Sequence, residues 1–217
     1  MIGISLFELT TFSMKQLFIV FEGIDGSGKS TQAKLLAEKL IADGHKIYTT
    51  FEPTDSPIGS MIRNIFKGRM TADHQTIAAL NVADRLDHLH NEINGLLKKK
   101  AEGYTIICDR YYFSSYAYQG VHMDMDWVIA ANALSAATLK PDVNLFIDVD
   151  PEVSMQRLNT TRGTIELYET LDNLKLVRSK YMEAFEKLKS EEKVVSINGN
   201  QTVAAIAEDI WMEVSRF

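Results

Sequence analysis

Residues 23 to 30 carry the spacing of a phosphate-binding loop. The segment Gly23-Ile24-Asp25-Gly26-Ser27-Gly28-Lys29-Ser30 fits the pattern GxxxxGK[ST]. Glycines let such a loop curl until successive backbone N–H groups point at phosphate oxygens, and the helix that follows adds its positive N-terminal end. In these loops the lysine reaches the β- and γ-phosphates and the hydroxyl is a ligand of Mg²⁺. The sequence therefore predicts a nucleotide site made by Gly23, Asp25, Gly26, Ser27, Gly28, Lys29, Ser30 and Thr31.

A second candidate Mg²⁺ ligand is Asp109. It ends the apolar run Ile106-Ile107-Cys108 and is followed directly by Arg110. An acid at the end of a buried strand is typical of the carboxylate that completes a magnesium site beside a phosphate-binding loop. A helix-capping aspartate is the alternative. We interpret Cys108, the single cysteine of the chain, as a buried apolar residue and not as a nucleophile.

Composition limits the partners and the compartment. The 217 residues include 23 Lys and Arg against 29 Asp and Glu, for a net charge of −6. This balance argues against a general binder of nucleic acids or anionic membranes, which needs a basic face. One cysteine forms no internal disulfide, no histidine spacing suggests zinc, and no apolar run approaches the roughly 20 residues of a membrane span. We expect a cytoplasmic protein with no nucleic-acid or membrane partner.

Strand and helix patterns alternate along the chain. Apolar or β-branched runs predict strands over residues 17–21, 46–51, 105–109, 143–149 and 194–197. Helical spacing predicts helices over about 29–42, 58–67, 72–100, 126–139, 151–158, 167–188 and 203–214. This order favours right-handed crossovers and a parallel sheet covered on both faces. We expect an α/β, three-layer P-loop NTPase fold with a five-stranded parallel sheet, formed by one domain over 14–217 after an extension over 1–13.

The phosphate-binding loop alone leaves a switch GTPase, a motor ATPase and a small-molecule kinase open. No NKxD-type segment for guanine is present, and a motor usually needs a longer chain. Transfer of a phosphoryl group between two small nucleotides requires cations on both sides of the moving group. The arginines outside the loop favour this third class.

Several segments resemble those of the bacterial-type thymidylate kinase family. Residues 21–31 resemble its loop FEGxDGxGKST, and residues 52–63 resemble EPGGTPxxExIR. Residues 83–85 resemble its A(A/D/N)R, residues 109–120 its DRYxxSxxAYQG and residues 166–169 its ERYE. Together these segments are spread over residues 21–169, which is most of the chain.

The resemblance implies that ATP, with Mg²⁺, phosphorylates dTMP to dTDP, and that the protein is a homodimer. In such an enzyme the catalytic residues would be Lys29, Arg110, Arg162 and Asp25, and the metal ligands Ser30 and Asp109. The acceptor dTMP would contact Asp25, Pro53, Arg63, Asn81, Arg85, Arg110, Ser115, Tyr118 and Gln119. Arg63 and Arg110 would hold its phosphate, Arg85 the thymine edge, and Tyr118 would crowd out a 2′-hydroxyl.

A lid is expected over about 157–166. Arg157 and Arg162 flank residues 158–161, which we interpret as a polar loop. The family's bacterial members supply an arginine from the lid when the phosphate-binding loop has none. Arg162, beside Gly163, is the preferred candidate, and Arg157 has a helix-surface ion pair as its alternative role.

The chain departs from the family pattern around the acceptor. Thr54-Asp55 replaces Gly-Gly, Phe51 replaces an arginine and Ser60 replaces a glutamate. Asn81 stands where the family usually has a phenylalanine that stacks on thymine, and Phe66 or Tyr112 are the rings that could substitute. The alternatives are a kinase of another nucleoside monophosphate or of a deoxynucleoside, or a non-catalytic nucleotide-binding module.

Overall fold

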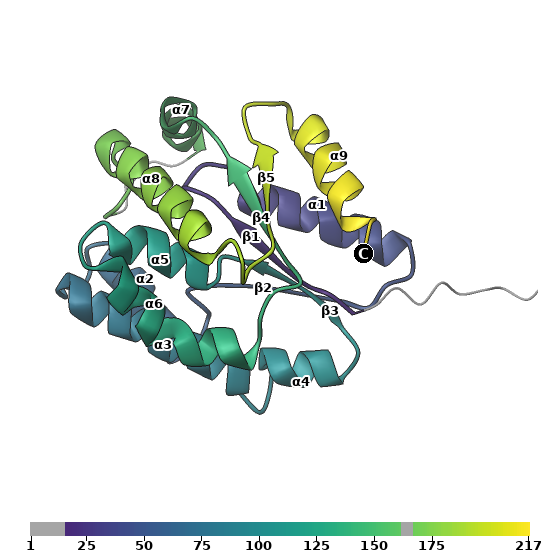
Figure 1. Ribbon diagram of the computed structural model, residues 1–217, viewed down its shortest axis with the longest axis horizontal. Coiled ribbons are helices and arrows are strands. Elements are labelled where there is room, and N and C mark those ends of the chain that lie inside the picture. Colours follow the sequence, from purple (N-terminus) through teal and green to yellow (C-terminus); the bar gives the residue numbers. More distant parts are fainter. Residues whose placement is uncertain (1–15, 162–166) are drawn as a thin grey trace, which may run out of the picture.

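The computed structural model describes residues 16–161 and 167–217. Its centre is a five-stranded sheet with the strand order β2-β3-β1-β4-β5, and every neighbouring pair is parallel (Figure 1). The strands are β1 (Phe18–Glu22), β2 (Ile47–Phe51), β3 (Thr105–Asp109), β4 (Val143–Asp148) and β5 (Val194–Asn198). The α/β fold expected from the sequence, with its five-stranded parallel sheet, is confirmed.

Helices cover both faces of this sheet. α1 and α9 lie on one face, and α3, α5, α6 and α8 lie on the other, so that the molecule has three layers (Figure 1). The helices are α1 (Lys29–Ala42), α2 (Pro57–Phe66), α3 (His74–His90), α4 (Leu96–Ala101), α5 (Tyr112–Gly120), α6 (Met125–Thr138), α7 (Pro151–Thr161), α8 (Leu171–Leu188) and α9 (Val203–Val214). None of the helices in the described parts is long and apolar enough to cross a membrane.

Strand β1 is buried along its whole length because its side chains pack against helices on both faces of the sheet. Ile19 and Phe21 pack among residues of α1 and α9, whereas Phe18 and Val20 pack among residues of α5 and α8. Successive side chains of a strand point to opposite faces, so a continuous apolar run is what a doubly covered central strand requires. The strand is thereby a rigid base for the loop that follows it.

Parallel pairing brings the chemistry-bearing residues to one edge. Phe21 in β1 lies opposite Asp109 in β3, and Phe51 in β2 lies opposite the same Asp109. The carboxyl ends of three neighbouring strands therefore meet where the phosphate-binding loop begins. This edge is where open α/β sheets bind ligands.

The predicted helix over 72–100 is wrong in one respect, because it is broken into α3 and α4. Asn91 ends α3, and its Oδ1 accepts a hydrogen bond of 2.9 Å from the Ile93 N–H. Any Cβ at Gly95 would lie 2.4 Å from the Asn91 carbonyl oxygen. The tight turn between the two helices thus depends on a local side-chain bond and a glycine.

Other boundaries also differ from the sequence prediction. Helix α7 continues to Thr161, so residues 158–161 are helical and not a polar loop. Helix α8 begins only at Leu171, because the Thr170 hydroxyl caps it by accepting from the Asn173 N–H. Residues 1–13, and the part of the expected lid beyond Thr161 up to residue 166, lie outside the described residues, so the extension and the lid stay predictions.

Candidate active site

The phosphate-binding loop is shaped by glycines in the left-handed region. Gly26 has φ 76° and Gly28 has φ 97°, and a Cβ at Gly26 would lie 2.7 Å from the Ser154 carbonyl oxygen. Lys29 folds back under the loop, where its Nζ donates to the Ile24 carbonyl at 2.9 Å. Burial, together with the nearby positive charge of Arg110, lowers the pKa of Lys29 to about 8. The loop therefore positions the Lys29 ammonium where it can bind a phosphate group.

The two predicted magnesium ligands lie in contact. Ser30 Oγ donates to Asp109 Oδ2 at 2.5 Å, while Asp109 Oδ1 is buried and has no hydrogen-bond partner in the described structure. No group of three or more His, Cys, Asp or Glu side chains in the described parts could hold a metal by itself. Mg²⁺ typically takes only one or two protein ligands and completes its octahedron with water and phosphate oxygens. The pair fits such an ion.

Arg110 adopts an unusual backbone conformation to reach the loop. Among the described non-glycine residues it alone has a positive φ, 72°. Its guanidinium forms an ion pair with Asp25 and donates to the Gly23 carbonyl at 3.2 Å. The Tyr118 hydroxyl donates to the other Asp25 oxygen at 2.8 Å, and the guanidinium lies over the Tyr118 ring at 4.9 Å. Residues of the phosphate-binding loop and of α5 thereby fix one arginine beside the loop.

Glu22, which lies in the segment that resembles FEGxDGxGKST but was assigned no role from the sequence, anchors this arrangement. Its carboxylate is fully buried and accepts hydrogen bonds from the Tyr111 N–H (2.9 Å), the Ser114 hydroxyl (2.6 Å) and the Tyr181 hydroxyl (2.8 Å). Burial raises the pKa of Glu22 against these hydrogen bonds, which lower it. The signals in the sequence are an acid that ends an otherwise apolar strand and its place in the segment that resembles FEGxDGxGKST. Glu22 fixes the start of α5, directly after Arg110.

Two of the cavities at this edge of the sheet contain both Asp25 and Arg110. The first encloses about 250 Å³. It is lined by Asp25, Phe51, Glu52, Pro53, Arg63, Phe66, Lys67, Asn81, Arg110, Ser114, Ser115, Tyr118, Gln119, Leu167, Tyr168 and Glu169. The second encloses about 510 Å³ and includes the phosphate-binding loop. It is lined by Asp25, Gly26, Ser27, Gly28, Lys29, Ser30, Thr31, Gln32, Asp109, Arg110, Arg157, Leu158, Thr160, Gln201, Val203 and Ile206.

The two cavities share Asp25 and Arg110. A ligand in each cavity would therefore direct one end toward the same guanidinium. Since Lys29 and Asp109 line only the second cavity, we call it the donor cavity, and the first the acceptor cavity. Of the residues expected to contact the acceptor, all but one line the acceptor cavity: Asp25, Pro53, Arg63, Asn81, Arg110, Ser115, Tyr118 and Gln119.

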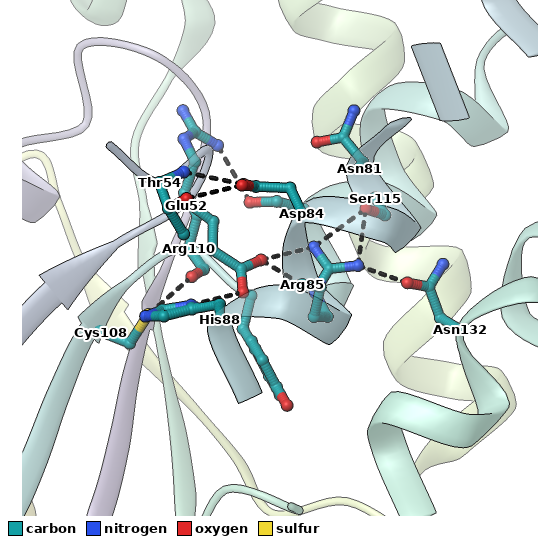
Figure 2. A network of polar contacts seen from close by, with 12 residues as sticks. Glu52, Thr54, Asn81, Asp84, Arg85, His88, Cys108, Arg110, Ser115 and Asn132 are labelled. Carbon is teal, nitrogen blue, oxygen red and sulfur yellow. Dashed lines mark hydrogen bonds and ion pairs between the residues drawn. The ribbon is translucent and has the colours of Figure 1, made fainter. Parts of the chain in front are cut away.

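The exception is Arg85, which lies behind the cavity wall. Its side chain is 2% exposed and forms an ion pair of 2.7 Å with Glu52, and its guanidinium also donates to Asn132 and to the Ser115 hydroxyl (Figure 2). Ser115, and not Arg85, borders the cavity. A direct contact between Arg85 and a base stays a prediction.

Glu52 and His88 belong to the same buried network. His88 Nδ1 lies 3.0 Å from Glu52 Oε1 (Figure 2). Its Nε2 lies 2.8 Å from the Thr50 hydroxyl. The sequence assigns neither residue a role, although Glu52 begins the segment that resembles EPGGTPxxExIR and His88 lies three positions after Arg85 on the same helix face. The network fixes the orientation of Arg85 and so that of Ser115.

Asp84 holds the loop that replaces the family's Gly-Gly. Its buried carboxylate accepts from the Thr54 N–H (2.8 Å), the Thr54 hydroxyl (2.6 Å) and the Ser56 hydroxyl (2.8 Å). A Cβ at Gly59 would lie 2.1 Å from the Thr54 carbonyl oxygen, so α2 approaches the loop closely. Arg63 then reaches back to the Pro53 carbonyl at 2.9 Å. The substitutions at 54 and 55 are thus accommodated by hydrogen bonds within the loop and to α3.

Of the two lid arginines, only Arg157 lies in the described residues. It lines the donor cavity and donates to the Gly199 carbonyl at 2.9 Å. Its alternative role, a helix-surface ion pair, stays a prediction. Arg162, the preferred catalytic candidate, lies outside the described residues.

Comparisons with known proteins agree with this geometry. A model of the thymidylate kinase family matches residues 21–210. The "Probable thymidylate kinase" of Methanocaldococcus jannaschii is 40% identical over 79% of this chain and 82% of its own length. The "Probable thymidylate kinase" of Pyrococcus horikoshii is 39% identical over 80% and 84%, and the "Thymidylate kinase" of Caldicellulosiruptor saccharolyticus is 35% identical over 91% and 95%. The chain belongs to the thymidylate kinase family.

Proposed function

We propose that this protein transfers the γ-phosphate of ATP to dTMP, giving ADP and dTDP. Membership of the thymidylate kinase family supports this reaction. The single observation that carries it is the junction of two cavities at Asp25 and Arg110. A kinase needs this arrangement, because the phosphates of donor and acceptor must meet in line at the same cations.

The reaction needs no covalent intermediate on the protein. A phosphate oxygen of dTMP attacks the γ-phosphorus of ATP, and the bond to the oxygen bridging β- and γ-phosphorus breaks as ADP leaves. Lys29 neutralises charge on the β- and γ-phosphates, and Arg110 holds the attacking phosphate close to them. Asp25 keeps the Arg110 guanidinium pointing toward the junction. We assign to Arg162 the stabilisation of the transferring group from the lid.

Ser30 and Asp109 would hold Mg²⁺ in this site. When bound, the ion offsets phosphate charge and orients the β- and γ-oxygens. The hydrogen bond between the two side chains is the contact that the ion would replace. The buried Asp109 Oδ1 supplies an acceptor that the described residues leave unused.

Tyr118 supports a preference for deoxyribose. Its hydroxyl is held by Asp25 at 2.8 Å and lies beside Arg110 at 3.2 Å, and the residue is only 7% exposed. A ring fixed in this way does not yield easily to an additional 2′-hydroxyl. UMP and other ribonucleotides should therefore be poorer acceptors than dTMP.

A homodimer in the cytoplasm is part of the proposal. Large apolar side chains remain exposed on α6, where Trp127 is 49% and Leu134 is 63% exposed. Exposed apolar groups of this size favour a protein interface. Light scattering on the purified protein measures the oligomeric state, and a monomer at micromolar concentration would contradict the dimer.

The activity is tested with ATP·Mg²⁺ and a panel of nucleoside monophosphates and nucleosides, by following ADP release. We expect dTMP to be the best acceptor and the Lys29→Met variant to lose turnover by orders of magnitude while staying folded. A preference for dUMP, CMP or thymidine would overturn the acceptor. ATP binding without acceptor-dependent ADP release would instead indicate a non-catalytic module.

A further inference from the structure

Phe66 stands at the end of α2 with its ring in the wall of the acceptor cavity. The Tyr168 ring meets it edge to face, with centroids 5.4 Å apart and an angle of 71°. The Leu167 N–H donates to the Phe66 carbonyl at 3.1 Å. Both backbone and ring of Phe66 are therefore held by the segment that precedes α8.

The acceptor cavity lies along α5, whose Ser115, Tyr118 and Gln119 line it. Arg110 precedes α5, and His122 follows it and contacts the Tyr168 ring at 5.7 Å. A helix of nine residues spans about 13 Å, roughly the length of a mononucleotide. The Tyr168 ring also contacts Tyr118 at 5.8 Å, so Tyr168 lies beside α5 in the wall of the same cavity. A nucleotide whose phosphate is bound at Arg110 therefore has its base within the cavity whose wall contains Phe66.

The other side chains that could stack on the base either have no ring, make other contacts or lie at the phosphate end. Asn81 has no ring, and its amide donates to the Ile77 carbonyl at 2.8 Å. Tyr112 is fully buried and donates to Glu192 at 2.7 Å, away from the cavity. Tyr118 already carries the Arg110 guanidinium on its ring. Phe51 pairs with Asp109 in the sheet register, which places it at the phosphate end.

We propose that Phe66 is the residue on which the acceptor's base stacks, in place of the ring that Asn81 does not provide. This inference rests on the proposed function, since it concerns the acceptor of that reaction. Phe66 and Tyr168 meet nearly perpendicular to one another in the cavity wall, and offset or edge contacts between a planar base and such rings are favourable. In the acceptor site the base is thus recognised by the Phe66 ring of α2, because α3 presents only the Asn81 amide at the corresponding place.

The test compares dTMP with 2-deoxyribose 5-phosphate, which has the same phosphate and sugar but no base. Affinities are measured by calorimetry on the wild-type protein and on Phe66→Ala, Phe66→Tyr and Phe51→Ala. For Phe66→Ala we expect dTMP to bind about ten-fold more weakly, because stacking on one aromatic side chain is worth about that factor. Binding of 2-deoxyribose 5-phosphate should stay within two-fold, and Phe66→Tyr should restore dTMP binding.

Phe51→Ala is the matched control, because it removes a ring from the same cavity at the phosphate end. It should alter the two ligands by the same factor, whereas Phe66→Ala should affect dTMP alone. Equal losses for both ligands in Phe66→Ala, or none for dTMP, would overturn the inference. A wild-type protein that binds dTMP but does not phosphorylate it would contradict the proposed function and leave the stacking result intact.

Discussion

Lys29 is a buried cation whose charge depends on pH near neutrality. In the protein without nucleotide its pKa lies near 8, because burial and Arg110 both disfavour the charged form. A bound triphosphate would bring negative charge against the ammonium and favour its protonated form. Nucleotide binding should therefore be coupled to proton uptake at this residue.

We expect ATP affinity to fall roughly ten-fold between pH 7 and pH 9. The sign follows because the free protein loses the Lys29 proton through pH 8, whereas the complex retains it to higher pH. Calorimetric titration in buffers of different ionisation enthalpy measures both the affinity and the proton uptake. In Lys29→Met the affinity should be weak and almost independent of pH, and an unchanged pH slope in that variant would contradict this assignment.

Arg110 is the residue at which donor and acceptor meet. We expect Arg110→Ala to lower kcat/KM for dTMP by at least about 100-fold, the usual loss when one charge-stabilising donor is removed. Steady-state kinetics measure this, with circular dichroism to establish that the variant is folded. Arg216→Ala, which removes an exposed arginine paired with Glu213 near the C-terminus, is a suitable control and should keep wild-type turnover.

At the scale of elements, the loop between β2 and α2 depends on a carboxylate from another helix. Asp84 in α3 accepts three hydrogen bonds from Thr54 and Ser56, and it is 1% exposed. The loop also supplies the Pro53 carbonyl, which accepts a hydrogen bond from Arg63. The acceptor site is therefore assembled by contacts between α3 and the start of α2.

We expect Asp84→Ala to lower the free energy of unfolding by roughly 2–4 kcal/mol, because it leaves a backbone N–H and two hydroxyls without their acceptor. Urea denaturation measures the change. Glu92→Ala, which removes an exposed acid just beyond α3, should stay within about 0.5 kcal/mol. Equal stability of the two variants would show that water replaces the lost acceptor.

The elements with a strong periodic pattern could be predicted from the sequence, and those set by tertiary contacts could not. The run Leu17 to Phe21 predicts β1, since a doubly buried strand leaves an unbroken apolar signature. Helix α5 carries no apolar stripe to reveal it, because all nine of its residues are buried between neighbouring elements. The break after α3 depends on Asn91 and Gly95, whose effect is local and interrupts no helical spacing.

The same division holds in the candidate site. Lys29, Ser30 and Asp109 follow from a linear motif and from the end of a strand, and the structure brings them together. Glu22 and Asp84 lie within segments that resemble the family, but their partners could not be predicted, and neither could Asn132, because each contact joins residues more than 25 positions apart. Arg85 was expected at the cavity surface, and the pairing with Glu52 that draws it behind Ser115 has no signature in the sequence.

For the whole molecule, a net charge of −6 coexists with a site for two polyanions. The cations are placed at the carboxyl edge of the sheet, where Lys29, Arg63 and Arg110 line the two cavities. Local placement of charge, and not the total, decides whether phosphates bind. The fold provides that placement because β1 and β3 are neighbours in the sheet.

We expect a bisubstrate ligand, adenosine joined to thymidine through a phosphate chain, to raise the Tm more than ATP and dTMP added together at the same concentration. The two cavities meet at Asp25 and Arg110, so one linked ligand can occupy both and binds with a lower loss of entropy. Differential scanning fluorimetry measures the shift. A linked ligand that stabilises no better than ATP alone would show that the cavities are not joined in solution.

The left-handed backbone at Arg110 means that stability and catalysis favour different residues at this position. An L-residue other than glycine loses roughly 1–2 kcal/mol in that conformation, so glycine would suit the fold better. Only arginine, however, supplies the guanidinium that both cavities share. A library of variants at residue 110 that is selected for thermal stability of the protein should accumulate glycine or asparagine. The same library, selected in cells whose growth requires the kinase activity, should retain arginine.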